Sequence, residues 1–288
     1  MIKTDGIGWR SLLFVPGTRP DRFGKAAASG ADAVCVDLED AVPPSRKDEA
    51  RGEALGFLAG PGGTACDRVV RINSVRTEPG LRDLLAVIEA RPEQGTIAVP
   101  KIESAEEVCW IDQLLAAAGS GLRVVAQIET LRGVEHATAI AGASPRLSGI
   151  MFGGLDLAAE LGAPASWDAL LHGRSRVIHA AALAGIPAID MPFVDVGDPD
   201  GCGREAHRAL GLGFSAKMVI HPTQVDVVNT IFSPTEEEIG QARRVIAALE
   251  EASGTAAGGV VLLDGRMVER PVVLAMQRIL ARAGVRAS

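Results

Sequence analysis

The chain has 288 residues, a formal net charge of −7, an apolar fraction of 47% and no tyrosine. An apolar fraction this high supports a large buried core and argues against disorder. The acidic balance and the scarcity of aromatic residues argue against a nucleic-acid binder, although local arginines can still hold an anionic substrate. The four cysteines form no CxxC pair, the first residues lack the apolar core of a signal peptide, and no apolar run is long enough to span a membrane. We therefore expect a cytoplasmic protein with reduced thiols and no membrane association.

Short apolar runs alternate with helix-length segments up to about residue 232. Eight runs are predicted strands, at residues 10–15, 33–38, 68–72, 96–100, 187–191 and 216–220, with two more that begin at Arg123 and Leu147. Helices are predicted after them, at residues 20–30, 45–59, 79–90, 167–184, 203–210 and 224–232. Ser104 opens one further helix, and another lies between the fifth and sixth strands. This alternation predicts an α/β fold, a (β/α)₈ TIM barrel, as a catalytic domain over residues 1–232. A doubly wound open sheet is the weaker alternative, because no GxGxxG follows the first strand.

Residues 233–288 are predicted to form an extension after the barrel. Ser233 to Glu236 match the N-cap to N3 positions of a helix, with Ser45 as the cap of an earlier one. SGTAAGG matches a flexible linker, VVLLDGRMVE a hairpin that turns at Asp264-Gly265, and residues 271–283 a closing helix. A lid, an arm to a neighbouring subunit, and a helix that only packs on the barrel remain open as the role of this extension.

Two acids, Glu129 and Asp156, follow the fifth and sixth predicted strands. Because a helical segment separates these strands, they form a βαβ unit, and both acids lie at the carboxyl edge of one sheet. Two carboxylates brought together either share a proton or hold a cation, and Mg²⁺ completed by water and substrate oxygens fits the pattern. Gly153 and Gly154 lack β-carbons and so let a ligand approach backbone N–H groups. In the alternative interpretation, each acid only starts a helix and is stabilised by the helix dipole.

Arg71 lies near the end of a strand whose neighbouring residues are apolar. A buried arginine needs an acid partner, and its planar guanidinium suits a carboxylate held by two bonds. The arginine is then either a clamp on a substrate carboxylate or a structural salt bridge to Glu39 or Asp40, and both hold if the acids orient it. Arg19, Arg22 and Lys25 either meet the phosphates of a long anionic cofactor or belong to a solvated helix face.

A metal, an arginine and open N–H groups together favour one kind of chemistry. Mg²⁺ can chelate an α-keto acid and stabilise negative charge on oxygen as a carbon–carbon bond breaks or forms. Arg71 and the N–H groups would then fix the carboxylate of that acid. The sequence therefore predicts aldol or Claisen chemistry, whereas the lack of a GxSxG motif or a Cys/His pair leaves acyl-enzyme hydrolysis unsupported.

Several stretches, in order over nearly the whole chain, resemble the citrate lyase β-subunit-like proteins of the HpcH/HpaI aldolase group. They are LLFVPGTRPDRFGKAAASGADAVCVDLEDAV, VVRIN, VPKIES, AQIETLRGV, MFGGLDLAAELG and GFSAKMVIHPTQVDVVNTIFSPTEEEI. The resemblance implies a Mg²⁺-dependent (β/α)₈ barrel, assembled as a trimer or hexamer. It also implies cleavage or formation of a 3-hydroxyacyl-CoA thioester, such as citryl-CoA, malyl-CoA or citramalyl-CoA, with a keto acid and an acyl-CoA as the other reactants. Other lyase subunits or an acyl carrier protein are partners that the resemblance leaves open.

The same resemblance assigns roles to individual positions. Glu129 and Asp156 match the metal ligands, and Arg71 and Glu129 match residues that meet the substrate. The remaining positions are Glu39 and Asp40, which match acid–base or supporting residues, and Phe14, Arg19 and Lys25, which match the segment on the CoA side.

The C-terminal segment departs from the family pattern. Relatives often carry an aspartate in a GKMIDAP-like run that reaches a neighbour's site, whereas the run here is GRMVERP, with Glu269 in that place. The extra methylene moves the carboxyl by about an ångström, which matters for a positioned acid. Glu269, contributed by a neighbour, is the resulting candidate for the proton carrier.

Two alternatives stay open beside the lyase. One is a pyruvate-type aldolase, or a malate-synthase-like or thioesterase-like enzyme, that uses the same metal–enolate chemistry. The other is a non-catalytic subunit with a degenerate site that acts through binding partners.

Overall fold

The computed structural model describes residues 7–60, 66–253, 261–263 and 265–284. The chain divides into two compact units, Met1–Thr230 and Ile231–Ser288. Apart from Ser253, the predicted linker SGTAAGG lies outside the described residues, and so does Asp264 of the predicted hairpin turn. Among the described helices, none combines the length and the apolar character that crossing a membrane requires.

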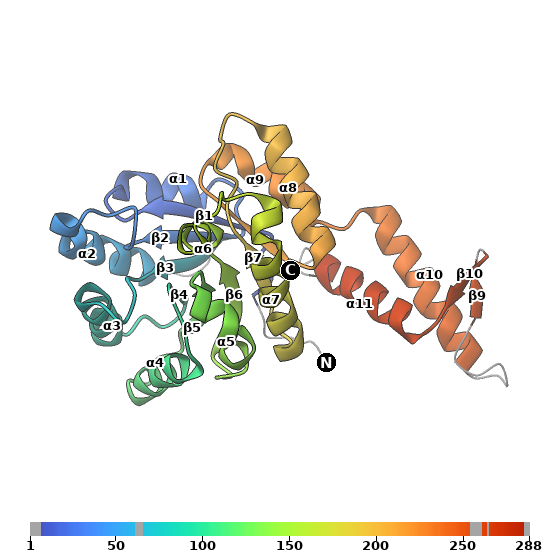
Figure 1. Ribbon diagram of the computed structural model, residues 1–288, viewed down its shortest axis with the longest axis horizontal. Helices are drawn as coiled ribbons and strands as arrows, with labels where there is room; N and C mark the ends of the chain where they lie inside the picture. The colour runs from blue at the N-terminus through green and yellow to red at the C-terminus, as the bar shows by residue number, and fades with distance from the viewer. Residues whose placement is uncertain (1–6, 61–65, 254–260, 264, 285–288) are drawn as a thin grey trace. The chain divides into compact units, whose positions relative to one another are not determined.

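The first unit is a closed barrel of eight parallel strands within the described residues, and their order in space is their order in sequence (Figure 1). The strands are β1 (Ser11–Pro16), β2 (Ala33–Asp37), β3 (Asp67–Arg71), β4 (Thr96–Val99), β5 (Arg123–Ile128), β6 (Leu147–Phe152), β7 (Ala188–Asp190) and β8 (Ala216–Val219). Strand β1 pairs with both β2 and β8, which closes the ring. The predicted (β/α)₈ barrel is confirmed, and the alternative of an open sheet is wrong, because β8 returns to β1.

Helices follow the strands and surround the barrel (Figure 1). They are η1 (Pro20–Arg22), α1 (Phe23–Ala27), η2 (Pro44–Arg46), α2 (Lys47–Leu58), α3 (Glu78–Ala90), α4 (Ala105–Ala117), α5 (Leu131–Ala141), α6 (Gly154–Leu161), α7 (Trp167–Ala184), α8 (Pro199–Leu212), η3 (Pro222–Gln224) and α9 (Val225–Phe232). Several helices begin at a side chain that accepts a backbone N–H, among them those capped by Thr77, Ser104, Thr130, Ser166 and Asp198. Because such a cap satisfies a donor that the helix itself leaves unpaired, each helix starts at a defined residue after its strand.

Two of the predicted helix caps are wrong. Ser45 lies inside η2, and α2 begins without a side-chain cap. The cap predicted at Ser233 instead falls two residues later, at Thr235. There the Thr235 hydroxyl accepts the Glu238 N–H at 3.2 Å, and the Glu238 carboxylate accepts the Thr235 N–H at 2.7 Å. This reciprocal pair is a capping box, in which two donors at the helix start are satisfied.

The second unit contains α10 (Glu236–Ser253), β9 (Val261–Leu263), β10 (Arg266–Val268) and α11 (Arg270–Gly284). Strands β9 and β10 pair antiparallel, as the predicted hairpin requires, and α10 packs against α11. A lid or an arm to a neighbour remains a prediction for this unit.

Candidate active site

A cavity of about 440 Å³ opens at the carboxyl ends of the barrel strands. Its wall is formed by Phe14, Val15, Pro16, Asp37, Asp40, Ala41, Arg71, Gln127, Glu129, Gly153, Gly154, Leu155, Asp156, Met191, Pro192, Met218 and Ile220. Residues at the ends of β1, β2, β3, β5, β6, β7 and β8 therefore meet in one cavity. Parallel strands of a barrel all end on the same rim, which is where barrel enzymes build their sites.

Glu129 follows β5 and is completely buried. Its Oε1 accepts the backbone N–H of Lys101 at 2.9 Å, and its Oε2 accepts a hydrogen bond from Gln127 Nε2. Burial, followed by the nearby charges of Glu39 and Asp156, raises the pKa of Glu129 well above its usual value. A carboxylate held in this way is stabilised by any cation that enters beside it.

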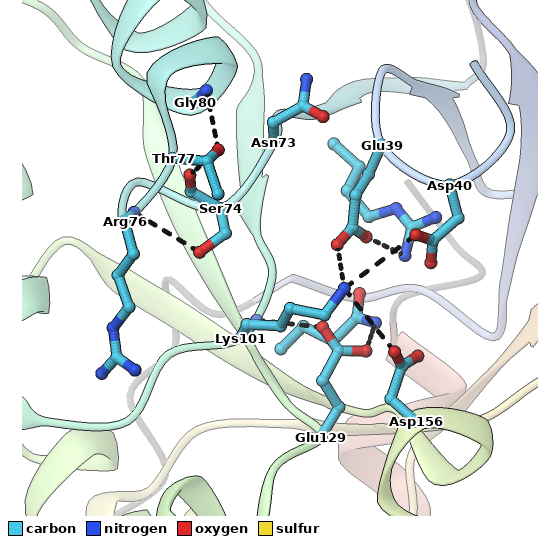
Figure 2. A network of polar contacts seen from close by, with 12 residues as sticks. Glu39, Asp40, Asn73, Ser74, Arg76, Thr77, Gly80, Lys101, Glu129 and Asp156 are labelled. Atoms are coloured by element: carbon cyan, nitrogen blue, oxygen red, sulfur yellow. Dashed lines mark hydrogen bonds and ion pairs between the residues drawn. The ribbon is translucent and has the colours of Figure 1, made fainter. Parts of the chain in front are cut away.

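Asp156 lies in the first turn of α6, a helix that the sequence analysis did not resolve from the sixth strand. Strand β6 ends at Phe152, so Asp156 is carried to the cavity by the helix start rather than by the strand tip. Its Oδ1 lies 3.6 Å from Lys101 Nζ. The carboxylates of Glu129 and Asp156 lie on the same rim, and both meet Lys101, Glu129 at its backbone N–H and Asp156 at its Nζ (Figure 2).

The donor set of this pair fits Mg²⁺. Both groups are hard carboxylate oxygens, the ligands that Mg²⁺ prefers. The described residues contain no group of three or more His, Cys, Asp or Glu placed to hold a metal, so a cation at this pair would take its other ligands from water and substrate. Gln127 Oε1 is buried beside Glu129 and has no hydrogen-bond partner among the described residues, which leaves an acceptor for a bound O–H.

Gly153 makes room for Glu129. A β-carbon at Gly153 would collide with Cβ and Oε2 of Glu129, and one at Gly154 would collide with the sulfur of Met191. The Gly153 N–H donates to the Ile128 carbonyl at 2.9 Å, so it belongs to the sheet and is not the open donor that the sequence predicts. Both glycines line the cavity, and the absence of their β-carbons leaves room for the side chains of Glu129 and Met191.

Arg71 is held by two acids of the neighbouring strand and its loop. Its Nε and Nη2 donate to both oxygens of Asp37, at 2.7 and 2.8 Å, and its Nη1 lies 2.8 Å from Glu39 Oε2. The guanidinium also lies over the ring of Phe14, 5.2 Å from its centroid. Although burial opposes it, the charge and hydrogen bonds of Arg71 hold the pKa of Asp37 below its usual value.

Both interpretations of Arg71 thus retain support. The salt bridge exists, with Glu39 as one predicted partner and Asp37 as a partner that the sequence analysis missed. Asp40 does not form an ion pair with Arg71 among the described residues. Its side chain is 61% exposed, and it lies 4.0 Å from Lys101 Nζ. Because Arg71 also lines the cavity, its acids orient it toward any ligand that enters.

Lys101 is the main site residue that the sequence analysis did not single out. It follows β4, and its φ of +55° lies in the left-handed region, which is uncommon for a residue with a side chain. Its Nζ donates to Glu39 Oε1 at 2.5 Å. Although burial opposes it, the hydrogen bond and charge of Glu39 raise the pKa of Lys101 above its usual value. The only sequence signal was a lysine directly after a predicted strand.

Residues 10–222 match the HpcH/HpaI aldolase/citrate lyase family. The chain belongs to this family. It is 36% identical over 283 residues to the citrate lyase subunit beta of Leuconostoc mesenteroides subsp. cremoris, covering 95% of this chain and 93% of that protein. It is also 36% identical over 277 residues to a (3S)-malyl-CoA thioesterase of Cereibacter sphaeroides, covering 96% and 94% of the two chains.

A solved structure gives the same assignment. The protein CitE from Mycobacterium tuberculosis, in complex with magnesium, acetoacetate and coenzyme A, is 34% identical with a TM-score of 0.78. The match covers 98% of this chain and 99% of that one. The resemblance read from the sequence motifs is therefore confirmed, and the chain is an enzyme of the citrate lyase β-like group of the HpcH/HpaI family.

Three residues assigned from the family pattern are not part of the described cavity wall: Arg19 and Lys25 of the first unit, and Glu269 of the second unit. Arg19 is ion-paired with Asp21 at 2.7 Å, and Lys25 is exposed on α1; neither is among the described residues that line the cavity. Glu269 precedes α11 in the second compact unit. The CoA-side and proton-carrier roles of these residues remain predictions.

Asp190, a strand-end acid of β7, belongs to a separate buried network. It accepts Arg174 Nε at 2.8 Å and Lys217 Nζ at 2.8 Å, and Lys217 also donates to Glu205 Oε1 at 2.7 Å. Arg174, Asp190 and Lys217 are each no more than 1% exposed, and the two cations are balanced by Asp190 together with the partly exposed Glu205. Because Asp190 and Lys217 lie on the paired strands β7 and β8, we expect this network to stabilise the barrel.

Replacing Asp190 by alanine is expected to lower the free energy of unfolding by about 3–5 kcal/mol, because two buried cations then share only Glu205. The measurement is the midpoint of urea unfolding, followed by circular dichroism. Asp168→Ala is the control, since Asp168 is 95% exposed and its ion pair with Arg208 spans 3.6 Å. Equal midpoints for the two variants would contradict a structural role of the network.

Proposed function

We propose that this protein is a Mg²⁺-dependent carbon–carbon lyase acting on a 3-hydroxyacyl-CoA thioester, such as citryl-CoA, malyl-CoA or citramalyl-CoA. The products are a keto acid and an acyl-CoA, and the reverse condensation uses the same groups. The observation that carries the proposal is the pair Glu129 and Asp156, whose carboxylates meet on one rim of a cavity that Arg71 also lines. Membership of the HpcH/HpaI family supports the reaction class.

Glu129 and Asp156 are the residues proposed to hold Mg²⁺. When bound, the ion supplies Lewis-acid stabilisation of negative charge on the keto or enolate oxygen, worth several kcal/mol. Gln127 fixes one oxygen of Glu129, and the Lys101 N–H fixes the other, so the carboxylate is oriented before a ligand arrives. The complex of the Mycobacterium tuberculosis relative with magnesium, acetoacetate and coenzyme A supports both the metal and the ligand class.

Arg71 is proposed to bind the carboxylate of the keto-acid half of the substrate. Asp37 and Glu39 hold the guanidinium in place, and Phe14 lies against its face. The arginine therefore reaches the ligand with little loss of side-chain entropy.

Proton transfer is proposed for Asp40 or Glu269 in preference to Glu39. Glu39 Oε1 accepts a hydrogen bond from Lys101, and its Oε2 lies against Arg71, so both of its oxygens already face cations. Asp40 lines the cavity and is largely exposed, which leaves it open to a substrate hydroxyl. Glu269 of a neighbouring chain is the second candidate, from its place in the family pattern.

Assembly and CoA binding complete the proposal. A trimer or hexamer would bring Glu269 to a neighbour's site. Phe14, Arg19 and Lys25 are proposed to meet the CoA portion, Phe14 from the cavity wall and the two cations from the adjoining first loop and α1. Other lyase subunits or an acyl carrier protein are further candidate partners.

A thioesterase is the second candidate function. It is favoured by the similarity to the (3S)-malyl-CoA thioesterase of Cereibacter sphaeroides, at 36% identity over nearly the whole chain. The two reactions differ in which bond breaks: the lyase breaks a carbon–carbon bond and keeps the thioester, whereas the thioesterase releases free CoA.

The test is a panel of citryl-CoA, malyl-CoA and citramalyl-CoA, each incubated with the purified full-length protein and Mg²⁺. A lyase releases a keto acid without free thiol, and we expect this with at least one thioester. EDTA is expected to stop the reaction, and added Mg²⁺ to restore it. Free thiol without keto acid would favour the thioesterase, and no product from any member of the panel would contradict both.

A further inference from the structure

Lys101 lies where its ammonium meets the proposed metal ligands. Its backbone N–H binds Glu129 at 2.9 Å, while its Nζ lies 3.6 Å from Asp156 Oδ1. Figure 2 shows the end of this side chain faced by three carboxylates, those of Glu39, Asp40 and Asp156, while Glu129 meets the Lys101 backbone. One residue therefore holds one metal ligand by its backbone and faces the other with its charge.

The proposed metal pair is weak by itself. It offers two protein carboxylates, and the described residues form no cluster of three or more acids, histidines or cysteines placed to hold a metal. The nearby acids Glu39 and Asp40 face Lys101 instead, at 2.5 and 4.0 Å from its Nζ. A positive charge that lies within 4 Å of Asp156 repels a second cation at the same carboxylate. An α-keto acid changes this balance, because its carboxylate adds negative charge and its two oxygens add ligands.

We infer that Lys101 competes with Mg²⁺ for Asp156 and so makes the metal bind together with an anionic keto acid rather than alone. This inference rests on the proposed function and adds a binding order to it. The positive charge of Lys101 keeps the affinity for the bare ion low, and the negative charge of the keto-acid carboxylate compensates this positive charge. Binding of Mg²⁺ and of the keto acid is therefore positively coupled, and each ligand tightens the other by the same factor.

The experiment measures Mg²⁺ dissociation constants by titration calorimetry on the full-length protein, with and without saturating oxaloacetate. Lys101→Met is expected to bind Mg²⁺ alone about tenfold more tightly than the wild type, because a repelling charge is removed. In the same variant, the gain in Mg²⁺ affinity caused by oxaloacetate is expected to be smaller. Lys101→Arg keeps the charge and is expected to retain a weak affinity for the bare ion.

A second variant protects the test against misfolding. Lys101→Asn also removes the charge, and asparagine tolerates the positive φ of this position better than most residues. Arg91→Asn is the matched control: Arg91 has a φ of +45° at the end of α3, is exposed, and does not belong to the described lining of the cavity. It changes the net charge equally and is expected to leave Mg²⁺ binding unchanged.

The two proposals fail in different ways. Unchanged or weaker binding of Mg²⁺ by both Lys101→Met and Lys101→Asn, with a wild type that binds the ion, would overturn the competition and leave the lyase proposal standing. A folded wild type that binds no Mg²⁺ even with oxaloacetate would overturn the metal-dependent function and the competition together.

Discussion

Replacing Asp156 by alanine is expected to lower Mg²⁺-dependent turnover by about a thousandfold while the barrel stays folded. The cation then keeps a single protein carboxylate, that of Glu129, and several kcal/mol of charge stabilisation in the transition state is lost. The measurement is steady-state turnover against Mg²⁺ concentration, with the thioester that reacts fastest in the panel. Circular dichroism and thermal unfolding report on the fold.

Asp200→Ala is the matched control for this prediction. Asp200 lies exposed in the first turn of α8, just as Asp156 lies in the first turn of α6. If Asp156 served only to stabilise the start of its helix, the two variants would behave alike, with a small loss of stability and normal turnover. Full activity of Asp156→Ala would therefore reject the metal site.

The second large effect is expected at Gly153, where alanine should lower turnover by about a hundredfold. Its β-carbon would overlap the side chain of Glu129, including the Cβ atom, which cannot move without the backbone. Glu129 then shifts from the position set by Lys101 and Gln127, and a displacement of about an ångström is enough to cost this factor. Turnover and Mg²⁺ affinity, measured on the same preparation, should fall together.

Gly56→Ala is the control for adding the same methyl group. Gly56 is exposed in α2, and a β-carbon there meets no atom within 4 Å. This variant is expected to gain about 1 kcal/mol in stability, because alanine favours the helix over glycine, and to keep its turnover. Unchanged Mg²⁺ affinity in Gly153→Ala would show that Glu129 does not depend on the space at this glycine.

The fold and the location of the site could be predicted because they depend on local patterns. Apolar runs alternating with helical segments predict parallel strands, and parallel strands carry their carboxyl ends to one rim. Glu129 and Asp156 were placed on that rim by chain order alone, without knowledge of any contact. The quoted motifs then matched the family over the whole barrel.

The partners of each charged group could not be predicted in the same way. Asp37 meets Arg71 because β2 and β3 pair in a register that puts these two residues side by side. Register and side-chain direction follow from packing across the sheet, and a shift of one residue would have exchanged the partner. For the same reason Asp190, which looks like another strand-end acid, was not separable from the site before its contacts with Arg174 and Lys217 were seen.

The sequence by itself determined the barrel, the rim that holds the site, and the acids and arginine from which a metal and keto-acid site can be built. These follow from periodicity and chain order, which act over a few residues at a time. Only the tertiary structure decided that Lys101 turns back toward Glu39 and Asp156, and that Gly153 leaves space for Glu129. Those relations join strands and loops up to 62 residues apart, and they exist only once the closed barrel brings the strand ends together.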